Sequence, residues 1–370
     1  MAQLSARRLV IKVGTSLLRG DSERPTAAVI ADLAATIARC QRRGSRIALV
    51  TSGAVGLGCA VMGLDKRPSE VEALQAAAAV GQGHLMALYQ DAFAVRGLTV
   101  AQVLLTRGDL ASRRRYQNAC RTLDHLLGWG IVPVVNENDT LATDELRFGD
   151  NDTLSALVAV AVGANELVLL TDVDRLYSGD PRLDPTAQPI AEVRDLAELN
   201  RLAGVASGGG QWGTGGMTTK LAAARIATAS GIRVRLADGR DPAVLDAVLQ
   251  AIEAAPPAGS EVPGTVFQPA DTPLPSRKGW LAHALAPRGS LRLDAGAEAA
   301  LLQRGASLLA VGVEAIEGEF SRHDAVRLLA SDGRELGRGL CEWSSAELAG
   351  LLGQGGIEVV HRDHLVLTTI

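Results

Sequence analysis

The sequence predicts an α/β protein in which helices sandwich a mainly parallel open sheet, followed by a small β-rich domain. Over the first two thirds of the chain, short apolar runs alternate with longer Ala-rich stretches at helical spacing, which is the pattern of a helix-covered parallel sheet. After Lys278 the runs become shorter and are separated by Gly or acidic turns. At 370 residues the chain also exceeds the usual length of one domain. We therefore expect one domain at 1–270 and a second at 278–365.

Six apolar runs are expected to be strands buried on both faces, because each is short and contains few polar residues. They are residues 8–13, 46–51, 99–105, 131–136, 166–171 and 232–237. Helices are expected between them at 27–43, 71–95, 115–128 and 152–162, and a further helix from about Met217. In the second domain we expect strands at 289–293, 307–313, 325–329 and 338–340.

Composition excludes several classes of protein. The hydrophobic fraction is 47% and the aromatic fraction only 3%, so the core must be aliphatic. A net charge of −4 argues against polyanions as main partners. The four cysteines are scattered and form no CxxC pair, so we expect neither a zinc site nor a disulfide framework. Residues 154–170 are apolar but interrupted by Gly, Asn and Glu, and no export signal is evident, so we expect a cytoplasmic protein without membrane spans.

Ligands of parallel sheets bind beyond the carboxyl ends of the strands, so the residues that follow each strand are informative. The first strand ends in Lys12-Val13-Gly14-Thr15-Ser16, where a glycine turn and a cation can hold phosphate, although no Walker A motif is present. The second strand ends in Thr51-Ser52-Gly53-Ala54. Two such turns on neighbouring strands could clasp a transferring phosphoryl group. A structural glycine turn remains the alternative for each.

Two acidic clusters follow the fourth strand, Asn136-Glu137-Asn138-Asp139 and Gly149-Asp150-Asn151-Asp152. They predict either a metal site or a site for an ammonium group. Calcium is disfavoured because the EF-hand spacing is missing. Asx turns and helix caps remain the alternative for single residues of these clusters.

Two further segments predict contacts with a nucleotide. The fifth strand ends in Thr171-Asp172. Residues 208–220 contain six glycines among thirteen residues and end at Lys220, close to the expected start of a helix. A glycine-rich loop lets the backbone approach a phosphate, and a lysine near a helix N-terminus adds charge of the same sign as the dipole. A flexible linker is the alternative.

Taken in order, these motifs resemble the glutamate 5-kinase family of amino acid kinases, and the tail after Lys278 resembles a PUA domain. The single Gly14 fits this family, since aspartokinases and acetylglutamate kinases usually have two glycines after the first lysine. One residue departs from the pattern: Arg175 stands where family members usually have glycine. If that glycine reflects a positive φ, arginine would be strained there, and the wall of the nucleotide pocket would differ.

The resemblance implies ATP-dependent phosphorylation of the γ-carboxylate of L-glutamate, the first step of proline biosynthesis, with Mg²⁺ bridging the ATP phosphates. It implies catalytic roles for Lys12, Lys220 and Asp152, with Asp152 positioning both lysines. The substrate-binding residues that it implies are Ser52, Asn136, Asp139, Asp150 and Asn151. The ATP-binding residues that it implies are Lys12, Gly14, Thr171, Asp172, Thr214, Gly215, Gly216, Met217, Thr218, Thr219 and Lys220.

The residues agree with this chemistry, because a carboxylate acceptor is already ionised at pH 7 and needs no general base. Phosphoryl transfer instead needs alignment and neutralisation of charge, which two lysines supply. Another carboxylate kinase of this fold, acting on aspartate, acetylglutamate or carbamate, remains an alternative. By resemblance we also expect feedback inhibition by proline. Residues 113–121, expected between the third strand and its helix, are a candidate wall of the site at which proline acts. A dimer or tetramer and functional coupling to glutamyl-phosphate reductase are expected as well.

A PUA-like tail raises RNA binding as a different class of function. From Lys278 to Ile370 the chain has nine Lys and Arg against twelve Asp and Glu, a formal charge of −3. Because binding to a phosphate backbone depends on clustered basic residues, we expect an accessory role for the tail and no nucleic-acid partner.

Overall fold

A computed structural model describes residues 6–20, 24–141, 151–207, 216–254, 262–273 and 287–367. The chain divides into two compact units, Met1–Pro273 and Leu274–Ile370, each with its own hydrophobic core. The mainly parallel sheet with helices on both faces and the separate β-rich unit confirm the predicted fold class. Within the described residues, no helix is long and apolar enough to cross a membrane.

An eight-stranded sheet with the order β3-β4-β2-β1-β5-β9-β10-β8 forms the centre of the first unit. Its strands are β1 (Arg8–Val13), β2 (Arg46–Thr51), β3 (Val100–Leu105), β4 (Val132–Glu137), β5 (Glu166–Thr171), β8 (Glu192–Val193), β9 (Arg233–Asp238) and β10 (Thr265–Phe267). Every pair in this order is parallel except β10 with β9, which is antiparallel. A separate two-stranded ladder joins β6 (Leu176–Tyr177) to β7 (Pro189–Ile190).

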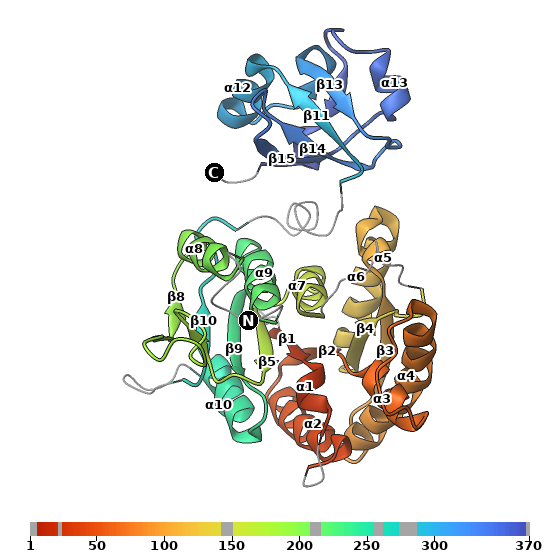
Figure 1. The fold of residues 1–370 in the computed structure, drawn as a ribbon, viewed down its shortest axis with the longest axis vertical. Helices are drawn as coiled ribbons and strands as arrows, with labels where there is room; N and C mark the ends of the chain where they lie inside the picture. The colour runs from red at the N-terminus through yellow and green to blue at the C-terminus, as the bar shows by residue number, and fades with distance from the viewer. Residues whose placement is uncertain are drawn as a thin grey trace, which may run out of the picture. The chain divides into compact units, whose positions relative to one another are not determined.

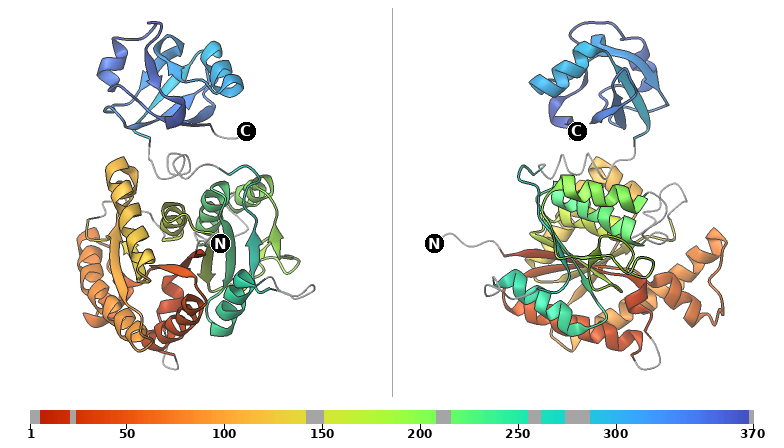
Figure 2. Two further views of the ribbon diagram at one scale, coloured as in Figure 1. Left: turned by 180° about the vertical axis from the view of Figure 1, so that it is seen from behind. Right: turned by 60° about the vertical axis from the view of Figure 1, so that its left-hand side comes forward.

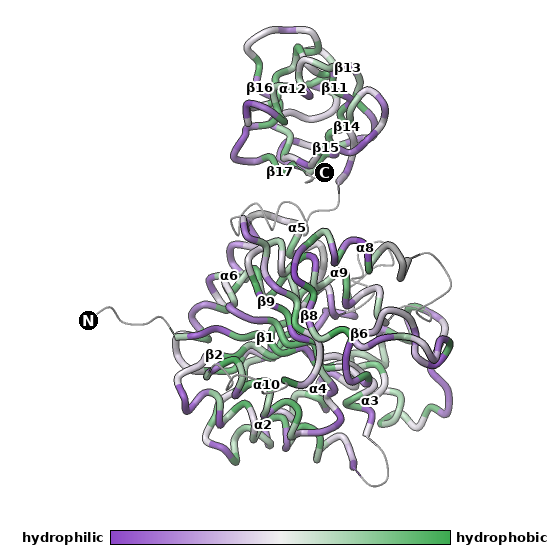
Figure 3. The backbone as a smooth tube through the Cα atoms, turned by 90° about the vertical axis from the view of Figure 1, so that its left-hand side faces the viewer, coloured by the Kyte–Doolittle hydropathy of each residue, from purple (hydrophilic) through white to green (hydrophobic). Residues whose placement is uncertain are grey.

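Helices cover both faces of this sheet (Figures 1 and 2). One face carries α1 (Thr15–Leu18), α2 (Thr26–Arg42), α3 (Ala54–Val61), α4 (Val71–Ala94) and α10 (Pro242–Glu253). The other carries α5 (Arg107–Ala111), α6 (Arg113–Gly128), α7 (Asn151–Ala161), α8 (Leu196–Ser207) and α9 (Gly216–Ala229). Because both faces are covered, most residues of the inner strands are hydrophobic, and Figure 3 shows this as green tube at the centre of the unit.

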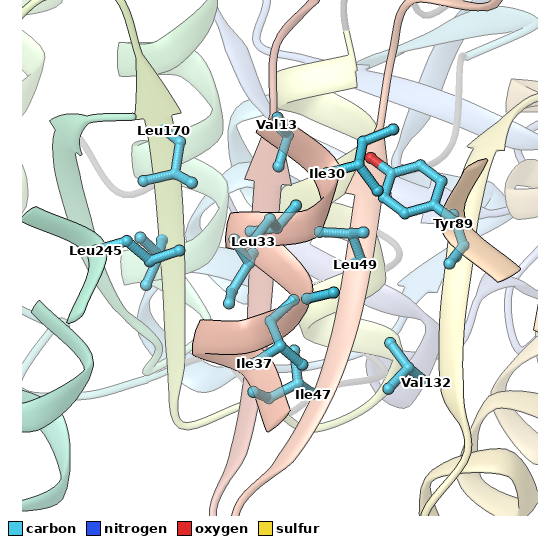
Figure 4. Packing of buried hydrophobic residues seen from close by; sticks show 14 of the residues in the cluster. Val13, Ile30, Leu33, Ile37, Ile47, Leu49, Tyr89, Val132, Leu170 and Leu245 are labelled. Atoms are coloured by element: carbon cyan, nitrogen blue, oxygen red, sulfur yellow. The ribbon is translucent and has the colours of Figure 1, made fainter. Parts of the chain in front are cut away.

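The core under α2, α4 and α10 is mainly aliphatic, with Tyr89 and Phe93 of α4 as its buried aromatic side chains. Ile30, Leu33 and Ile37 lie one turn apart along α2 and pack against Ile47 and Leu49 of β2 (Figure 4). This spacing is the apolar stripe of an amphipathic helix meeting a buried strand. The packing fixes the sheet beneath the helices and thereby fixes where each strand ends.

The second unit contains a five-stranded sheet with the order β13-β11-β14-β15-β17. Its elements are β11 (Gly289–Leu293), α12 (Ala295–Arg304), β12 (Leu308–Leu309), β13 (Val313–Glu317), β14 (Ala325–Leu329), β15 (Glu335–Leu340), α13 (Ser345–Ala349), β16 (Glu358–Val360) and β17 (Leu365–Leu367). The pairs are antiparallel except β11 with β14, and β12 pairs with β16 outside this sheet. Leu291, Leu328 and Leu336 are fully buried in its core.

Two expectations about the elements are wrong. The expected strand at 99–105 is β3, an edge strand whose residues are mostly only half-buried, because it has a neighbour on one side only. The expected strand at 307–313 is the two-residue strand β12 followed by a short 3₁₀ turn, Ala310–Gly312, and β13 then begins at Val313. An apolar run does not reveal a turn of this kind, because the buried side chains continue through it.

Candidate functional site

A buried charge cluster lies where β1 ends and α7 and α9 begin. Lys12 Nζ lies 2.6 Å from Asp152 Oδ1, and Lys220 Nζ lies 3.2 Å from Asp152 Oδ2. Thr219 donates its hydroxyl to the same Oδ2 at 3.0 Å. Asp152 is fully buried, and Lys12 is 3% exposed. Three residues that the sequence analysis singled out from three separate motifs therefore form one connected group.

Local features of the backbone place the two lysines of this cluster. Lys12 is the last residue but one of β1, hydrogen-bonded in register between β2 and β5. A Cβ at Gly14 would lie 3.5 Å from Lys12 Nζ, so the glycine keeps space open beside the ammonium group. Lys220 lies in the fifth position of α9, one residue further along the helix than a start at Met217 would place it, and its Nζ also reaches the Gly216 carbonyl at 3.1 Å.

A chain of amides runs beside this cluster. Asn151 Nδ2 lies 2.5 Å from the Thr51 carbonyl, 3.0 Å from Ser52 Oγ and 2.8 Å from Asn136 Oδ1. Asn136 Nδ2 donates to Gln82 Oε1 on α4 at 2.8 Å. The ends of β2 and β4 and the start of α7 are therefore joined by side-chain hydrogen bonds.

Two glycines bring α3 and α4 into backbone contact next to these amides. Gly53 follows β2 with a φ of 98° and lets the chain turn directly into α3. A Cβ at Gly81 would lie 1.8 Å from the Ala54 carbonyl oxygen, and one at Gly58 would lie 1.8 Å from the Ala77 carbonyl oxygen. The helices can pack this closely only because both side chains are absent, and Gln82 follows Gly81 directly.

A cavity of about 220 Å³ lies beyond the carboxyl ends of β3 and β4. Its lining residues are Ala78, Ala79, Gln82, Gly83, Gln102, Leu104, Glu137, Asn138, Asp139 and Thr140. Asp139, one of the expected substrate-binding residues, is in this wall. Asp150 lies outside the described residues.

The expected nucleotide-binding residues lie partly within the described chain. Thr171 ends β5, and its hydroxyl donates to Asp172 Oδ1 at 3.2 Å. Gly216, Met217, Thr218 and Thr219 form the first turn of α9, whereas Thr214 and Gly215 lie outside the described residues. The first turn of this helix thus begins beside Lys220 and Asp152, where free backbone N–H groups suit an anion.

The backbone at Arg175 does not have the positive φ that the family pattern suggested, so it is not strained in that way. Among the described residues other than glycine, positive φ occurs at His323 and not at Arg175. Arg175 instead pairs with Asp174 at 3.0 Å, and Asp174 also accepts a hydrogen bond from Tyr177. The arginine is therefore accommodated in an ordinary turn with a charged partner on the chain.

The expected position of residues 113–121 is wrong. They do not connect the third strand to its helix but belong to α6 itself, which begins at Arg113. The connection is made by α5, which Thr106 and Asp109 start with a reciprocal capping box. The polar, Arg-rich start of α6 conceals this boundary in the sequence.

Sequence reasoning missed two residues of this region, both on α4. Tyr89 is fully buried, and its hydroxyl lies 2.8 Å from Thr51 Oγ1, directly behind the second strand end. Burial raises the pKa of Tyr89, so the phenol stays protonated at neutral pH. Gln82 is the other. Both follow the apolar spacing of a helix, and nothing in the sequence separates them from core residues.

Comparison with known proteins defines the class of this fold and site. The amino acid kinase family model matches residues 7–238, and the PUA domain model matches residues 289–362. Because the first match covers more than half of the chain, the chain belongs to the amino acid kinase family.

Full-length relatives narrow this class. A glutamate 5-kinase of Parasynechococcus marenigrum is 61% identical over 97% of this chain and 98% of its own length. Those of Synechococcus sp. (strain CC9902) and Thermosynechococcus vestitus are 60% and 50% identical, over 97% and 98% of this chain and 98% and 100% of their own lengths. Within the amino acid kinases, the chain is therefore a member of the glutamate 5-kinases, as the resemblance predicted.

Proposed function

We propose that the chain transfers the γ-phosphoryl group of ATP to the γ-carboxylate of L-glutamate, giving L-glutamyl 5-phosphate and ADP. The observation that carries this proposal is the cluster at the carboxyl end of the sheet, in which the buried residues Lys12 and Asp152 pair with each other and the half-buried Lys220 pairs with Asp152. Likeness to full-length glutamate 5-kinases supports glutamate as the acceptor. The reaction is the first step of proline biosynthesis.

Lys12 and Lys220 stabilise the charge of the transferring phosphoryl group, and Asp152 holds both ammonium groups in place. Since both oxygens of one carboxylate are engaged by the two lysines, the lysines share a fixed geometry and their mutual repulsion is reduced. At about 4 Å and an effective dielectric of about 20, two unit charges interact by roughly 4 kcal/mol. Preorganised cations therefore contribute substantially to the rate without moving during the reaction.

No general base takes part, because the acceptor carboxylate is ionised before it reacts. The γ-carboxylate oxygen attacks the γ-phosphorus, the bond to the β-phosphate oxygen breaks, and ADP leaves with that electron pair. The described residues contribute alignment and charge, as phosphoryl transfer requires.

Ser52, Asn136, Asp139, Asp150 and Asn151 bind glutamate in this proposal. The hydrogen bonds from Asn151 to the Ser52 hydroxyl and to Asn136 support a common site for three of them. Asp139 lines the adjacent cavity, where a carboxylate suits the substrate ammonium group.

Lys12, Gly14, Thr171 and Asp172 and residues 214–220 bind ATP in this proposal. In the described residues no group of three or more His, Cys, Asp or Glu is placed to hold a metal. From the resemblance, Mg²⁺ is proposed to arrive with ATP as part of the substrate, since Mg²⁺ is commonly bound through substrate phosphates.

Cytoplasmic localisation, inhibition by proline, a dimer or tetramer, and coupling to glutamyl-phosphate reductase are proposed from the resemblance. The domain limits proposed are 1–270 for the kinase and 278–365 for the PUA domain. Two compact units, Met1–Pro273 and Leu274–Ile370, and two family models, over residues 7–238 and 289–362, support this division.

A substrate panel tests the proposed function. Purified protein is incubated with MgATP, hydroxylamine and one acceptor at a time, and the acyl phosphate is trapped as its hydroxamate. L-Glutamate should give hydroxamate, while aspartate and acetylglutamate should not. Hydroxamate from aspartate or acetylglutamate in place of glutamate would assign the chain to another carboxylate kinase of this fold.

A further inference from the structure

Of the two polar atoms of the Gln82 side-chain amide, the oxygen has a hydrogen-bond partner and the nitrogen has none. Its Oε1 accepts the hydrogen bond from Asn136 Nδ2 at 2.8 Å. The orientation of Asn136 is fixed in turn, because its Oδ1 accepts from Asn151 Nδ2 at 2.8 Å and from the Glu137 backbone N–H at 2.9 Å. The amide nitrogen of Asn136 must therefore face Gln82, and Gln82 must present its oxygen to it.

Gln82 Nε2 is consequently left without a partner. This nitrogen is buried and has no hydrogen-bond partner. Turning the amide over would not help, since two amide NH₂ groups would then face each other. Buried polar groups are nearly always paired, and Gln82 is one of the residues that line the cavity, so we infer that a ligand there supplies the acceptor.

The rest of the cavity wall defines the acceptor. Among the described residues that line it, the ionisable side chains are Glu137 and Asp139, both acidic. An amino acid end carries an ammonium group and a carboxylate. The acidic side chains suit the ammonium group, and the carboxylate, which cannot pair with them, needs a neutral donor.

We propose that Gln82 Nε2 donates a hydrogen bond to the α-carboxylate of the bound amino acid and thereby selects acceptors that carry one. This role rests on the proposed function and deepens it. Gln82 contacts the end of the substrate that does not react, so it acts on recognition and not on phosphoryl transfer. The chain of amides from Gln82 through Asn136 to Asn151 holds the donor in place.

The substitution Gln82→Glu tests this, because it keeps an oxygen for Asn136 and replaces the donor with a carboxylate. Steady-state kinetics by ADP release would compare L-glutamate with L-isoglutamine, in which the α-carboxylate is an amide and the γ-carboxylate is retained. We expect the KM for glutamate to rise at least tenfold, or about 1.4 kcal/mol, with the KM for ATP unchanged. The preference for glutamate over isoglutamine in kcat/KM should fall at least tenfold, since the isoglutamine amide can donate to the introduced carboxylate.

Gln90→Glu is the matched control, because it makes the same change at an exposed position two turns along α4. It should leave both substrates unaffected. Should Gln82→Glu fail to fold, Gln82→Met removes the donor without adding charge, although it also removes the acceptor of Asn136, and it should raise the KM for glutamate more than the KM for isoglutamine. An unchanged KM for glutamate, or an equal loss for both acceptors, would overturn the role of Gln82. If the unsubstituted protein does not phosphorylate glutamate, the proposed function itself fails.

Discussion

The two units of the chain differ in how many polar and charged side chains they bury. In the first, Lys12 and Asn136 are buried at the ends of β1 and β4, and Asn151 and Asp152 are buried at the start of α7. In the described part of the second, the one buried polar side chain is Ser290, and ion pairs such as Arg292 with Glu317 lie on the surface. Burying a charge costs free energy unless it is paired, so the buried charges of the first unit fit the phosphoryl-transfer site proposed there.

Of the substitutions that test this difference between the units, Asp152→Ala should have the largest effect on stability and turnover. It removes the carboxylate that both lysines contact, and breaking a buried ion pair from one side costs about 3–5 kcal/mol. We expect a loss of that size in the free energy of unfolding, measured in urea, and a larger loss of turnover than either lysine substitution gives. Asp124→Ala is the control, since this aspartate is 60% exposed and pairs with Arg8 at the surface. A change below about 1 kcal/mol at Asp152 would contradict the comparison.

Lys12→Ala and Lys220→Ala should each retain the fold but lower turnover at least a hundredfold, which corresponds to about 2.7 kcal/mol of transition-state stabilisation. Hydroxamate formation at saturating substrates measures the loss, and circular dichroism checks the fold. Lys66→Ala, at an exposed site, provides the control. Near-normal turnover in both variants would remove their assigned roles.

Tyr89→Phe should have an intermediate effect, confined to stability. It deletes one buried hydrogen bond to Thr51 and leaves the ring packed in the core, so unfolding should become easier by about 1 kcal/mol. Tyr177→Phe, whose hydroxyl bonds to Asp174 at the surface, should change stability less. Equal effects would mean that burial behind the second strand end adds nothing.

Arg292→Ala in the second unit should have the smallest effect. Its side chain and that of Glu317 are 41% and 48% exposed, and such pairs contribute about 0–1 kcal/mol. We expect thermal unfolding within error of the unsubstituted protein at moderate salt, and unchanged turnover. A clear loss of turnover would show that the second unit is not merely accessory.

The fold class and the polar residues at strand ends could be predicted from the sequence, because both follow from the spacing of the apolar residues. Lys12 and Asn136 were found since polar residues directly after apolar runs must reach the carboxyl edge of a parallel sheet. Gln82 could not be found in this way. It lies on α4 among residues at core spacing, and only the orientation of three amides in space shows that its nitrogen is unpaired.

The errors have similar physical causes. Apolar character alone does not show how many neighbours a strand has, so the edge strand β3 could not be told from an inner one. The helix expected at 115–128 begins two residues earlier, at Arg113, and the sequence did not show this because three consecutive arginines carry no apolar stripe. At Arg175 the family pattern suggested a strained backbone with positive φ, but the backbone there does not have a positive φ.

The backbone contact between α3 and α4 means that a residue without a side chain sets the position of a residue that has one. Gly81 presses against the Ala54 carbonyl, and Gln82 is its neighbour. A single methyl group added at Gly81 would push α4 outward and carry the Gln82 amide with it. Preference among amino acid acceptors could thus drift, in natural divergence or in directed evolution, through a position that touches no substrate atom.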